Sequence, residues 1–214
     1  MDEQLKEYLL TTLPSNDHWV KKLKIKAEEN NIPIMEPLSI NLLLQIIRIK
    51  KPKKILEIGT AIGYSALRMH TAYPSSQIIT IERDPTCYEQ AIHNIQEQNK
   101  QDNIQVIYGD AREKLTEIHA NKHKFDLIFI DAAKSHYKRF FELSNPLLNN
   151  SGIILTDNVL FKGYVAKPNI ENSRLNKLAE KIRNFNKWLV SHPEYITTII
   201  PIGDGVAISY KKDV

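Results

Sequence analysis

Acidic and amide side chains stand where two neighbouring strands of the expected sheet end. Asp131 closes the fourth strand, and Asp157 and Asn158 close the fifth. Because the carboxyl ends of parallel strands meet at one edge of a sheet, we expect these three side chains to lie close together. Two carboxylates in close contact repel each other unless a cation lies between them. An oxygen-only donor set suits Mg²⁺, with Mn²⁺ or Ca²⁺ as alternatives, whereas zinc prefers cysteine or paired histidine.

A lysine follows this candidate metal site. Lys134 is either a solvent-facing lysine at a helix start or a general base, and its closeness to Asp131 favours the second role. A neighbouring cation disfavours the charged ammonium, so the amine can accept a proton from a hydroxyl that the metal polarises. Asp131 and Lys134 are therefore the predicted catalytic pair. His136 and Tyr137 either face the substrate or pack in the core.

A cofactor site is expected at the same edge. The dinucleotide fingerprint G-x-G-x-x-G is absent, because Ala61 stands where its second glycine would follow Gly59. Glu82, at the end of the second strand, can accept hydrogen bonds from both ribose hydroxyls of an adenosine ligand. Asp110 ends the third strand, where the adenine would lie. A carboxylate at Glu57 suits an amine or a sulfonium better than a pyrophosphate, which favours S-adenosylmethionine (SAM) over NAD.

Apolar runs alternate with helical segments along the chain. The expected strands cover 53–59, 77–84, 104–111, 125–132, 152–159, 195–202 and 206–212, and the expected helices cover 2–10, 16–30, 38–50, 64–73, 85–99, 112–121, 135–148 and 174–191. The first five strands indicate a parallel sheet, and the last two indicate an antiparallel hairpin. We predict an α/β fold with a doubly wound, mostly parallel seven-stranded sheet. It forms a single domain over 1–214, with a helical cap over 1–50 and the α/β core over 51–214.

Composition excludes several classes of protein. The chain is 42% hydrophobic and 25% charged, as globular domains with a full core are, and 7 Gly and 10 Pro are too few for low complexity. Its single cysteine, Cys87, cannot form an internal disulfide, and we place it in a helix away from the active edge. No window reaches the roughly 20 apolar residues of a membrane span. We expect a cytoplasmic protein that does not contact membranes.

Six segments together resemble the metal-dependent O-methyltransferases of the catechol and caffeoyl-CoA type. They are ILEIGTAIGYSAL, IERDP, YGDA, FIDAAKSHY, TDNVL and IPIGDGVAIS, in the family's order between about residues 33 and 211. The resemblance implies a Rossmann-like methyltransferase fold that uses SAM. Within the family, the chain most resembles the bacterial enzymes that methylate 5-hydroxyuridine at the tRNA wobble position.

The resemblance also implies roles for individual residues. It places the metal on Asp131, Asp157 and Asn158, and it makes Lys134 the catalytic lysine. Met35 occupies a position beside the methyl donor. The implied cofactor contacts are Met35, Glu57, Gly59, Ser65, Glu82, Asp110, Ala111 and Asp131. Family members of this kind form homodimers, and the N-terminal helices are candidates for the contacts.

The acceptor has two candidates, because metal chelation requires two adjacent oxygens and both catechols and 5-hydroxyuracil have them. The net charge of +4 divides into +3 over 1–54, −3 over 55–130 and +4 over 131–214. The basic N-terminal segment, together with Lys162, Lys167 and Arg174, could flank the pocket, and Tyr164 could stack on a base. We therefore expect the tRNA anticodon region as the first partner. A small catechol-like or phenylpropanoid substrate is the second.

Overall fold

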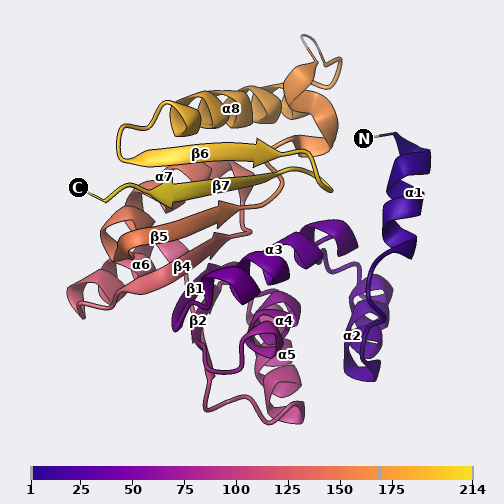
Figure 1. The fold of residues 1–214 in the computed structure, drawn as a ribbon, viewed down its shortest axis with the longest axis vertical. Coiled ribbons are helices and arrows are strands. Elements are labelled where there is room, and N and C mark those ends of the chain that lie inside the picture. The colour runs from indigo at the N-terminus through magenta and orange to yellow at the C-terminus, as the bar shows by residue number, and fades with distance from the viewer. Residues whose placement is uncertain (1, 168–169, 214) are drawn as a thin grey trace.

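The computed structural model describes residues 2–167 and 170–213. Seven strands form one sheet in the order β3-β2-β1-β4-β5-β7-β6 (Figure 1). Their bounds are β1 Lys54–Ile58, β2 Gln77–Glu82, β3 Ile104–Tyr108, β4 Phe125–Ile130, β5 Leu148–Thr156, β6 Tyr195–Ile200 and β7 Val206–Lys211. The pairs among β1 to β5 are parallel, and β7 pairs antiparallel with both β5 and β6. The predicted doubly wound sheet with its antiparallel C-terminal hairpin is confirmed.

The sheet is buried on both faces because its central strands, β1 and β4, are mostly apolar. Successive side chains of a strand point to opposite faces. Ile55 accordingly packs in the core cluster on one face and Leu56 in the cluster on the other, and both are fully buried. This two-sided burial explains why the strands appear in the sequence as continuous apolar runs rather than alternating ones.

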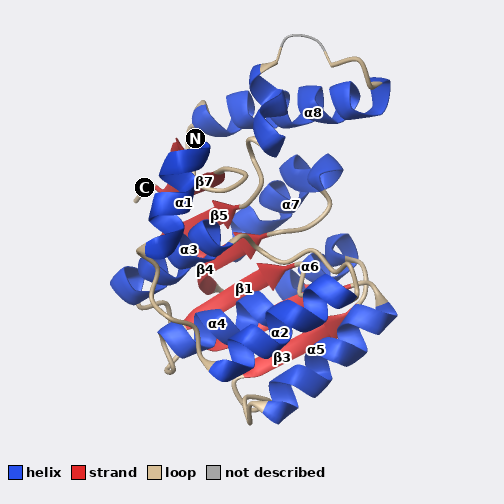
Figure 2. Cartoon of the chain, turned by 90° about the vertical axis from the view of Figure 1, so that its right-hand side faces the viewer, coloured by secondary structure: helices blue, strands red, loops and turns tan. Residues whose placement is uncertain are grey.

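Helices form a layer on each face (Figures 1 and 2). Helices α2, α3, α4 and α5 contribute buried residues to the core on the first face, and α6, α7 and α8 to the core on the second. The helix bounds are α1 Glu3–Thr11, α2 His18–Glu29, α3 Pro37–Lys50, α4 Tyr64–Ala72, α5 Pro85–Glu97, α6 Ala111–Ala120, α7 Tyr137–Ser144 and α8 Ser173–Val190. Helix α1 has no buried residue. Among the described residues, no helix is long and apolar enough to cross a membrane.

The segment between β4 and β5 differs from its prediction. The expected helix over 135–148 is a 3₁₀ turn (Lys134–His136), then α7, then a second 3₁₀ turn that contains Pro146. Proline cannot donate a backbone hydrogen bond within a helix, so α7 stops before it. Strand β5 then starts at Leu148, four residues earlier than expected.

Candidate functional site

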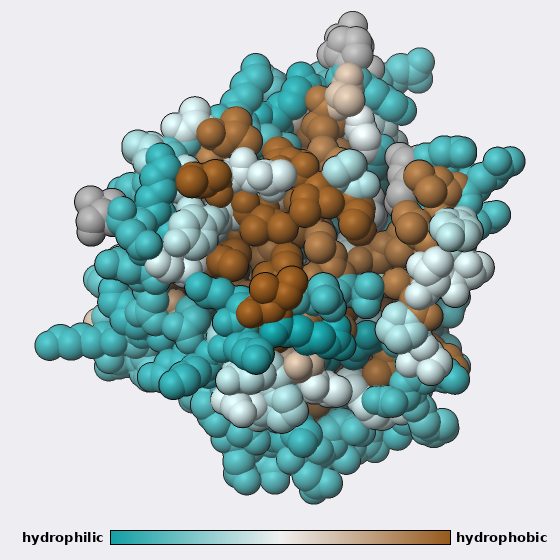
Figure 3. Space-filling model, in the orientation of Figure 1, coloured by the Kyte–Doolittle hydropathy of each residue, from teal (hydrophilic) through white to brown (hydrophobic). Residues whose placement is uncertain are grey.

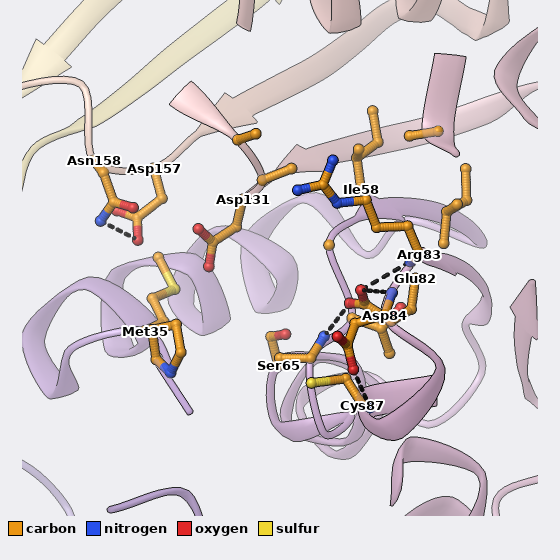
Figure 4. A pocket seen from close by; sticks show the side chains of 18 of the residues that line it. Met35, Ile58, Ser65, Glu82, Arg83, Asp84, Cys87, Asp131, Asp157 and Asn158 are labelled. Atoms are coloured by element: carbon orange, nitrogen blue, oxygen red, sulfur yellow. Dashed lines mark hydrogen bonds between the residues drawn. The ribbon is translucent and has the colours of Figure 1, made fainter. Parts of the chain in front are cut away.

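A cavity of about 590 Å³ opens at the carboxyl ends of β1 to β5 (Figure 4). It lies where the strand order reverses, between β1 and β4, which is the usual ligand site of open α/β sheets. Ten of the predicted site residues line it: Met35, Gly59, Ser65, Glu82, Asp110, Ala111, Asp131, Lys134, Asp157 and Asn158. Of the predicted residues, only Glu57 does not reach its wall.

The loop after β1 crosses closely over the end of β4. Gly59 has a φ of +100°, and a Cβ built there would lie 2.0 Å from the backbone oxygen of Asp131. No residue with a side chain can therefore replace it without moving the strand end. Ala61, at the position of the missing fingerprint glycine, has a φ of +46°. Its N–H donates to Glu82 Oε2 at 2.8 Å, so this loop helps to fix an acidic side chain rather than a phosphate.

Glu82 is held by the backbone around it. Besides the bond from Ala61, its Oε1 accepts from the N–H groups of Arg83 and Asp84, both at 2.8 Å (Figure 4). A carboxylate can accept about four hydrogen bonds, so capacity remains for a ligand hydroxyl. The orientation of Glu82 toward the cavity is thus set before any ligand binds.

Asp110 caps helix α6 and pairs with an arginine. Its carboxylate accepts from Arg112 Nε at 2.9 Å, from Arg112 Nη2 at 2.6 Å and from the Arg112 backbone N–H at 2.8 Å. These hydrogen bonds lower the pKa of Asp110 to about 2. The next residue, Ala111, is the first of α6 and lines the cavity.

Glu57 is fully buried behind the cavity wall. Thr80 Oγ1 donates to its Oε2 at 2.6 Å, while Oε1 has no hydrogen-bond partner. Burial raises the pKa of Glu57 to about 8. Ser65, on the first turn of α4, does line the cavity.

Met35 enters the cavity from the N-terminal part of the chain. It is 4% exposed and lies in the turn just before α3, whose first residue is Pro37. Proline is favoured at the first position of a helix because its φ is already helical and its missing N–H would be unpaired there. The turn therefore stops at a defined point beside the cavity.

The acidic cluster lies at the opposite side of the cavity from Glu82. Figure 4 shows Asp131, Asp157 and Asn158 near one another at the ends of β4 and β5. Asn158 Nδ2 donates to Asp157 Oδ2 at 3.1 Å, and Lys134 Nζ donates to Asn158 Oδ1 at 2.8 Å. The tyrosine of α7, Tyr137, donates from its hydroxyl to the backbone oxygen of Asp157 at 2.9 Å and so fixes the end of β5.

These side chains fit a hard divalent cation. Burial raises the pKa of both Asp131 and Asp157, and the nearby charge of Asp131 raises the pKa of Asp157 further. The ammonium of Lys134 partly offsets the rise at both carboxylates. Asp157 Oδ1 is buried with no hydrogen-bond partner. Among the described residues, no three Asp, Glu, His or Cys side chains converge as a metal site, so this donor set reaches three only with the amide of Asn158. Oxygen donors of this kind suit Mg²⁺ or Mn²⁺.

Two interpretations from the sequence need correction or completion. Cys87 does not lie away from the active edge: it is on the first turn of α5 and lines the cavity near Glu82 (Figure 4). Burial raises the pKa of its thiol to about 11, which leaves it a poor nucleophile. Of the pair left open, His136 lines the cavity, whereas Tyr137 is buried in the core.

The two basic runs of the N-terminal segment, 21–26 and 48–54, do not line the cavity. Residues 48–54 run from the end of α3 into the first residue of β1, and Gly59 follows the other end of that strand. The run 48–54 therefore lies at the edge of the sheet opposite the cavity. In the other run, Lys22 pairs with Glu97 of α5 at 3.1 Å and Lys26 donates to Asn94. Of the basic residues singled out, only Lys162 lines the cavity.

Several wall residues were missed by the sequence reasoning. Glu36, Tyr64, Arg112 and Asp204 all line the cavity. Asp204 was visible in the segment IPIGDGVAIS but was read only as part of a hairpin turn. Arg112 follows Asp110 by two residues, and nothing in the sequence indicated that its side chain would turn back to pair with that carboxylate.

Comparison with known proteins agrees with this geometry. The sequence profile of a family described as O-methyltransferase matches residues 13–212. The chain is 32% identical over 220 residues to a caffeoyl-CoA O-methyltransferase of Populus kitakamiensis, and the alignment covers 96% of this chain and 92% of that one.

Solved structures share the whole fold. A Staphylococcus aureus protein, provisionally described as a caffeoyl-CoA O-methyltransferase, has a TM-score of 0.86 at 35% identity, with 98% of both chains covered. An O-methyltransferase from Bacillus cereus, crystallised with S-adenosylhomocysteine (SAH), has a TM-score of 0.85 at 26% identity, with 98% of this chain and 97% of that one covered.

Proposed function

The chain belongs to the O-methyltransferase family, of the caffeoyl-CoA O-methyltransferase type, and on that premise we propose that it methylates one hydroxyl of a small catechol-like or phenylpropanoid acceptor with a divalent cation. It is a SAM-dependent O-methyltransferase. The observation that carries the proposal is the pair of carboxylates on the cavity wall, Asp157, which is buried, and Asp131, which is partly exposed, beside Asn158 and Lys134.

We call the side of the cavity formed by the loop after β1, Glu82 and Asp110 the donor end. In the proposed function, Glu82 binds the ribose hydroxyls of SAM and Asp110 with Ala111 binds the adenine. Gly59 lets the backbone approach the ligand closely, and Ser65 and Met35 flank the methyl donor. SAM supplies a methyl group on a sulfonium, and a positive charge near Glu57 would favour the ionised form of that carboxyl, which burial otherwise disfavours.

We call the side formed by Asp131, Lys134, Asp157 and Asn158 the acceptor end. The two carboxylates and the amide oxygen of Asn158 would hold a divalent cation, which would supply Lewis-acid polarisation of the acceptor hydroxyl. Lys134 Nζ lies 2.8 Å from Asn158 Oδ1. At this distance from a side chain that would hold the cation, the amine of Lys134 is placed to remove the proton of the acceptor hydroxyl.

The remaining work of the protein is orientation. Attack on a sulfonium methyl requires the acceptor oxygen, the methyl carbon and the sulfur to lie in line. The donor and acceptor ends belong to one continuous cavity, so both substrates can be held at once. A second oxygen on the acceptor, next to the reacting hydroxyl, would let it chelate the cation and set the direction of attack.

The test is methyl transfer by the purified protein with SAM and Mg²⁺. We expect methylation of catechol or caffeate and none of phenol, because phenol has one oxygen and cannot chelate. EDTA should abolish the activity and added Mg²⁺ or Mn²⁺ restore it. Equal methylation of catechol and phenol, or full activity in EDTA, would contradict the proposal.

A second candidate acceptor is 5-hydroxyuridine at the wobble position of tRNA, to give 5-methoxyuridine. The observation in its favour is a basic and aromatic group in the segment that follows β5, made of Lys162, Tyr164 and Lys167. Lys162 lines the cavity, and Lys167 Nζ lies 5.1 Å from the centre of the Tyr164 ring. Lysine and aromatic side chains of this kind bind phosphates and stack on unpaired bases.

Mass spectrometry of tRNA nucleosides separates the two acceptors. If tRNA is the substrate, cells that lack the protein should accumulate 5-hydroxyuridine, and binding of hydroxyuridine-containing tRNA should weaken steeply with salt. Turnover of caffeate without any methylation of such tRNA would leave the small acceptor as the substrate.

We also propose that the chain forms a homodimer through the sheet face that the helices leave open. Ile196 of β6 is 60% exposed and lies beside its register partner Tyr210 of β7, which is 36% exposed. Figure 3 shows apolar side chains gathered on this face of the molecule. Leu5 and Tyr8 of α1 are also exposed. Exposed apolar side chains that gather on one face of a folded protein mark a surface for association with another protein.

Light scattering after size-exclusion chromatography tests the dimer. The wild-type chain should elute as a dimer at micromolar concentration, and Ile196→Asp should shift it to a monomer that still binds SAH. A monomeric wild type would contradict this proposal without affecting the proposed chemistry.

A further inference from the structure

The turn that follows β5 is held in an unfavourable backbone conformation. Asn158, Phe161, Lys162 and Gly163 have φ values of 58°, 48°, 52° and 75°. L-residues other than glycine rarely adopt this left-handed region, and asparagine tolerates it best. Phe161 and Lys162 have no such tolerance, so contacts from outside the turn must hold them there.

Those contacts come from the turn between β6 and β7. The N–H of Val159 donates to the backbone oxygen of Gly205 at 3.0 Å, and the N–H of Leu160 donates to the backbone oxygen of Asp204 at 2.8 Å. The carboxylate of Asp204 accepts from the backbone N–H of Lys162. Asp204 thus binds the turn through both its main chain and its side chain.

The β6–β7 turn is itself packed too closely to swing away. Ser39 Oγ of α3 donates to the backbone oxygen of Ile202 at 3.3 Å. A Cβ built on Gly203 would lie 2.1 Å from Ser39 Oγ, and one built on Gly205 would lie 2.3 Å from a carbon of the Leu160 side chain. The Asp204 carboxylate therefore stands in a fixed place between α3 and the turn after β5.

The contact between Asp204 and the turn after β5 affects the reaction because the turn contains Asn158. Its first residue, Asn158, accepts from Lys134 Nζ at 2.8 Å and donates to Asp157 Oδ2 at 3.1 Å. Lys162 lines the cavity further along the same turn, as Asp204 itself does. A shift of the turn would move Asn158 relative to Lys134 and Asp157, while the donor end would stay as it is.

We infer that Asp204 is a positioning residue for methyl transfer: by accepting from the Lys162 N–H, its carboxylate holds the left-handed turn that presents Asn158 to Lys134 and Asp157. The role of Asn158 in the reaction rests on the proposed function. The hold on the turn does not, because it depends only on the hydrogen bonds and the close packing of the two turns.

The experiment compares Asp204→Ala, which removes the acceptor, with Asp204→Asn, which keeps an oxygen acceptor and removes the charge. Asp102→Ala, at an exposed aspartate, serves as the matched control. Three quantities are measured for each: hydrogen exchange of the amides over 159–163, the Kd for SAH, and kcat and KM for catechol with SAM and Mg²⁺.

For D204A we expect at least tenfold faster exchange over 159–163 and a kcat at least tenfold lower, with the Kd for SAH within twofold of wild type. D204N should stay within threefold of wild type in all three, because its amide oxygen can still accept from Lys162. D102A should not differ from wild type.

Several results would overturn the inference. Unchanged exchange in D204A would show that the carboxylate does not hold the turn. Loss of SAH binding in D204A would show that Asp204 supports the whole fold rather than the acceptor end. A D204N variant as slow as D204A, with wild-type exchange, would show that the charge acts on the reaction directly. If wild type itself does not methylate catechol, the proposed acceptor fails, and the exchange data still decide whether Asp204 holds the turn.

Discussion

The donor end and the acceptor end of the cavity hold their carboxylates in opposite ways. At the donor end, three backbone N–H groups bind Glu82, and Arg112 lowers the pKa of Asp110 to about 2. At the acceptor end, burial raises the pKa of Asp131 and Asp157, and Asp157 Oδ1 has no partner. At the donor end, other groups of the chain compensate the negative charge of the carboxylates. At the acceptor end, the two carboxylates have more negative charge than the neighbouring groups compensate.

The difference indicates what each end is built to bind. A carboxylate whose lone pairs are mostly taken by backbone N–H groups is a rigid acceptor for a neutral donor such as a sugar hydroxyl. Two neighbouring desolvated carboxylates with one lysine nearby are costly to keep charged unless a cation binds them. The uncompensated negative charge at the acceptor end is therefore the strongest physical argument for a metal in the proposed function.

Removing a charge at the acceptor end should have the largest effect on activity. In Asp157→Asn the Lewis-acid contribution is lost, and we expect methyl transfer to fall by roughly 10³-fold, equivalent to ~4 kcal/mol. The same variant should melt at a higher temperature than wild type without metal, because a buried charge with a raised pKa is removed. Asp102→Asn is the control. A D157N variant that keeps wild-type activity, or that melts below wild type without metal, would contradict the difference between the two ends of the cavity.

Removing the proposed base should have the next largest effect. Lys134→Ala is expected to lower kcat by roughly 10²-fold at neutral pH, the usual contribution of a general base. The deficit should narrow as pH rises, because the acceptor hydroxyl then ionises without help. Lys138→Ala, on the exposed side of α7, should keep wild-type activity. A pH-independent deficit would point to a structural role for Lys134.

A change at the donor end should affect binding rather than chemistry. In Glu82→Gln one side of the carboxylate becomes an NH₂ group that cannot accept from the backbone, so the side chain turns from its place. We expect the Kd for SAH to rise roughly tenfold to a hundredfold, the range for losing hydrogen bonds to a charged group, with kcat at saturating SAM changed by less than about threefold. Glu89→Gln, exposed on α5, is the control. An equal loss in kcat would show that the two ends are not separable.

The last prediction concerns the stability of the chain and its pH dependence at Glu57, rather than activity. Burial raises its pKa in the folded state to about 8 from the ordinary value of 4.5, so between these values the folded chain binds a proton that the unfolded chain has lost. Stability therefore falls as pH rises from about 4.5 to about 8. Glu57→Gln cannot lose that proton, and its melting temperature should gain on wild type across this interval. Calorimetry of both proteins without SAM measures the difference, and parallel curves would contradict the assignment.

The sequence predicted the strand ends well because periodicity is local. Each buried strand is a short apolar run, and a polar residue after it marks the end, so Asp131, Asp157 and Glu82 could be placed at one edge of the sheet. The chain's own hydrogen bonds could not be read in this way. That Arg112 turns back onto Asp110, or that Glu82 collects three backbone N–H groups, depends on how a loop folds after its strand.

Positions on helices and in turns were harder to predict for a related reason. Cys87 lies on a helix, but whether the first turn of α5 faces the cavity depends on the direction in which α5 leaves β2. The run 48–54 is basic in any conformation, yet the sheet carries it to the edge opposite the cavity. The order of residues shows where charges lie along the chain, whereas packing decides which of those charges lie near the cavity.

The sequence by itself determined the seven strands, the parallel core and the set of oxygen-bearing side chains that its strand ends bring together, because burial on both faces requires continuous apolar runs and their ends share one edge. Tertiary structure alone decided that β7 inserts between β5 and β6 and brings Asp204 against the turn after β5. The two segments are about 40 residues apart in sequence. Their contact depends on long-range antiparallel pairing and close packing, which local patterns do not encode.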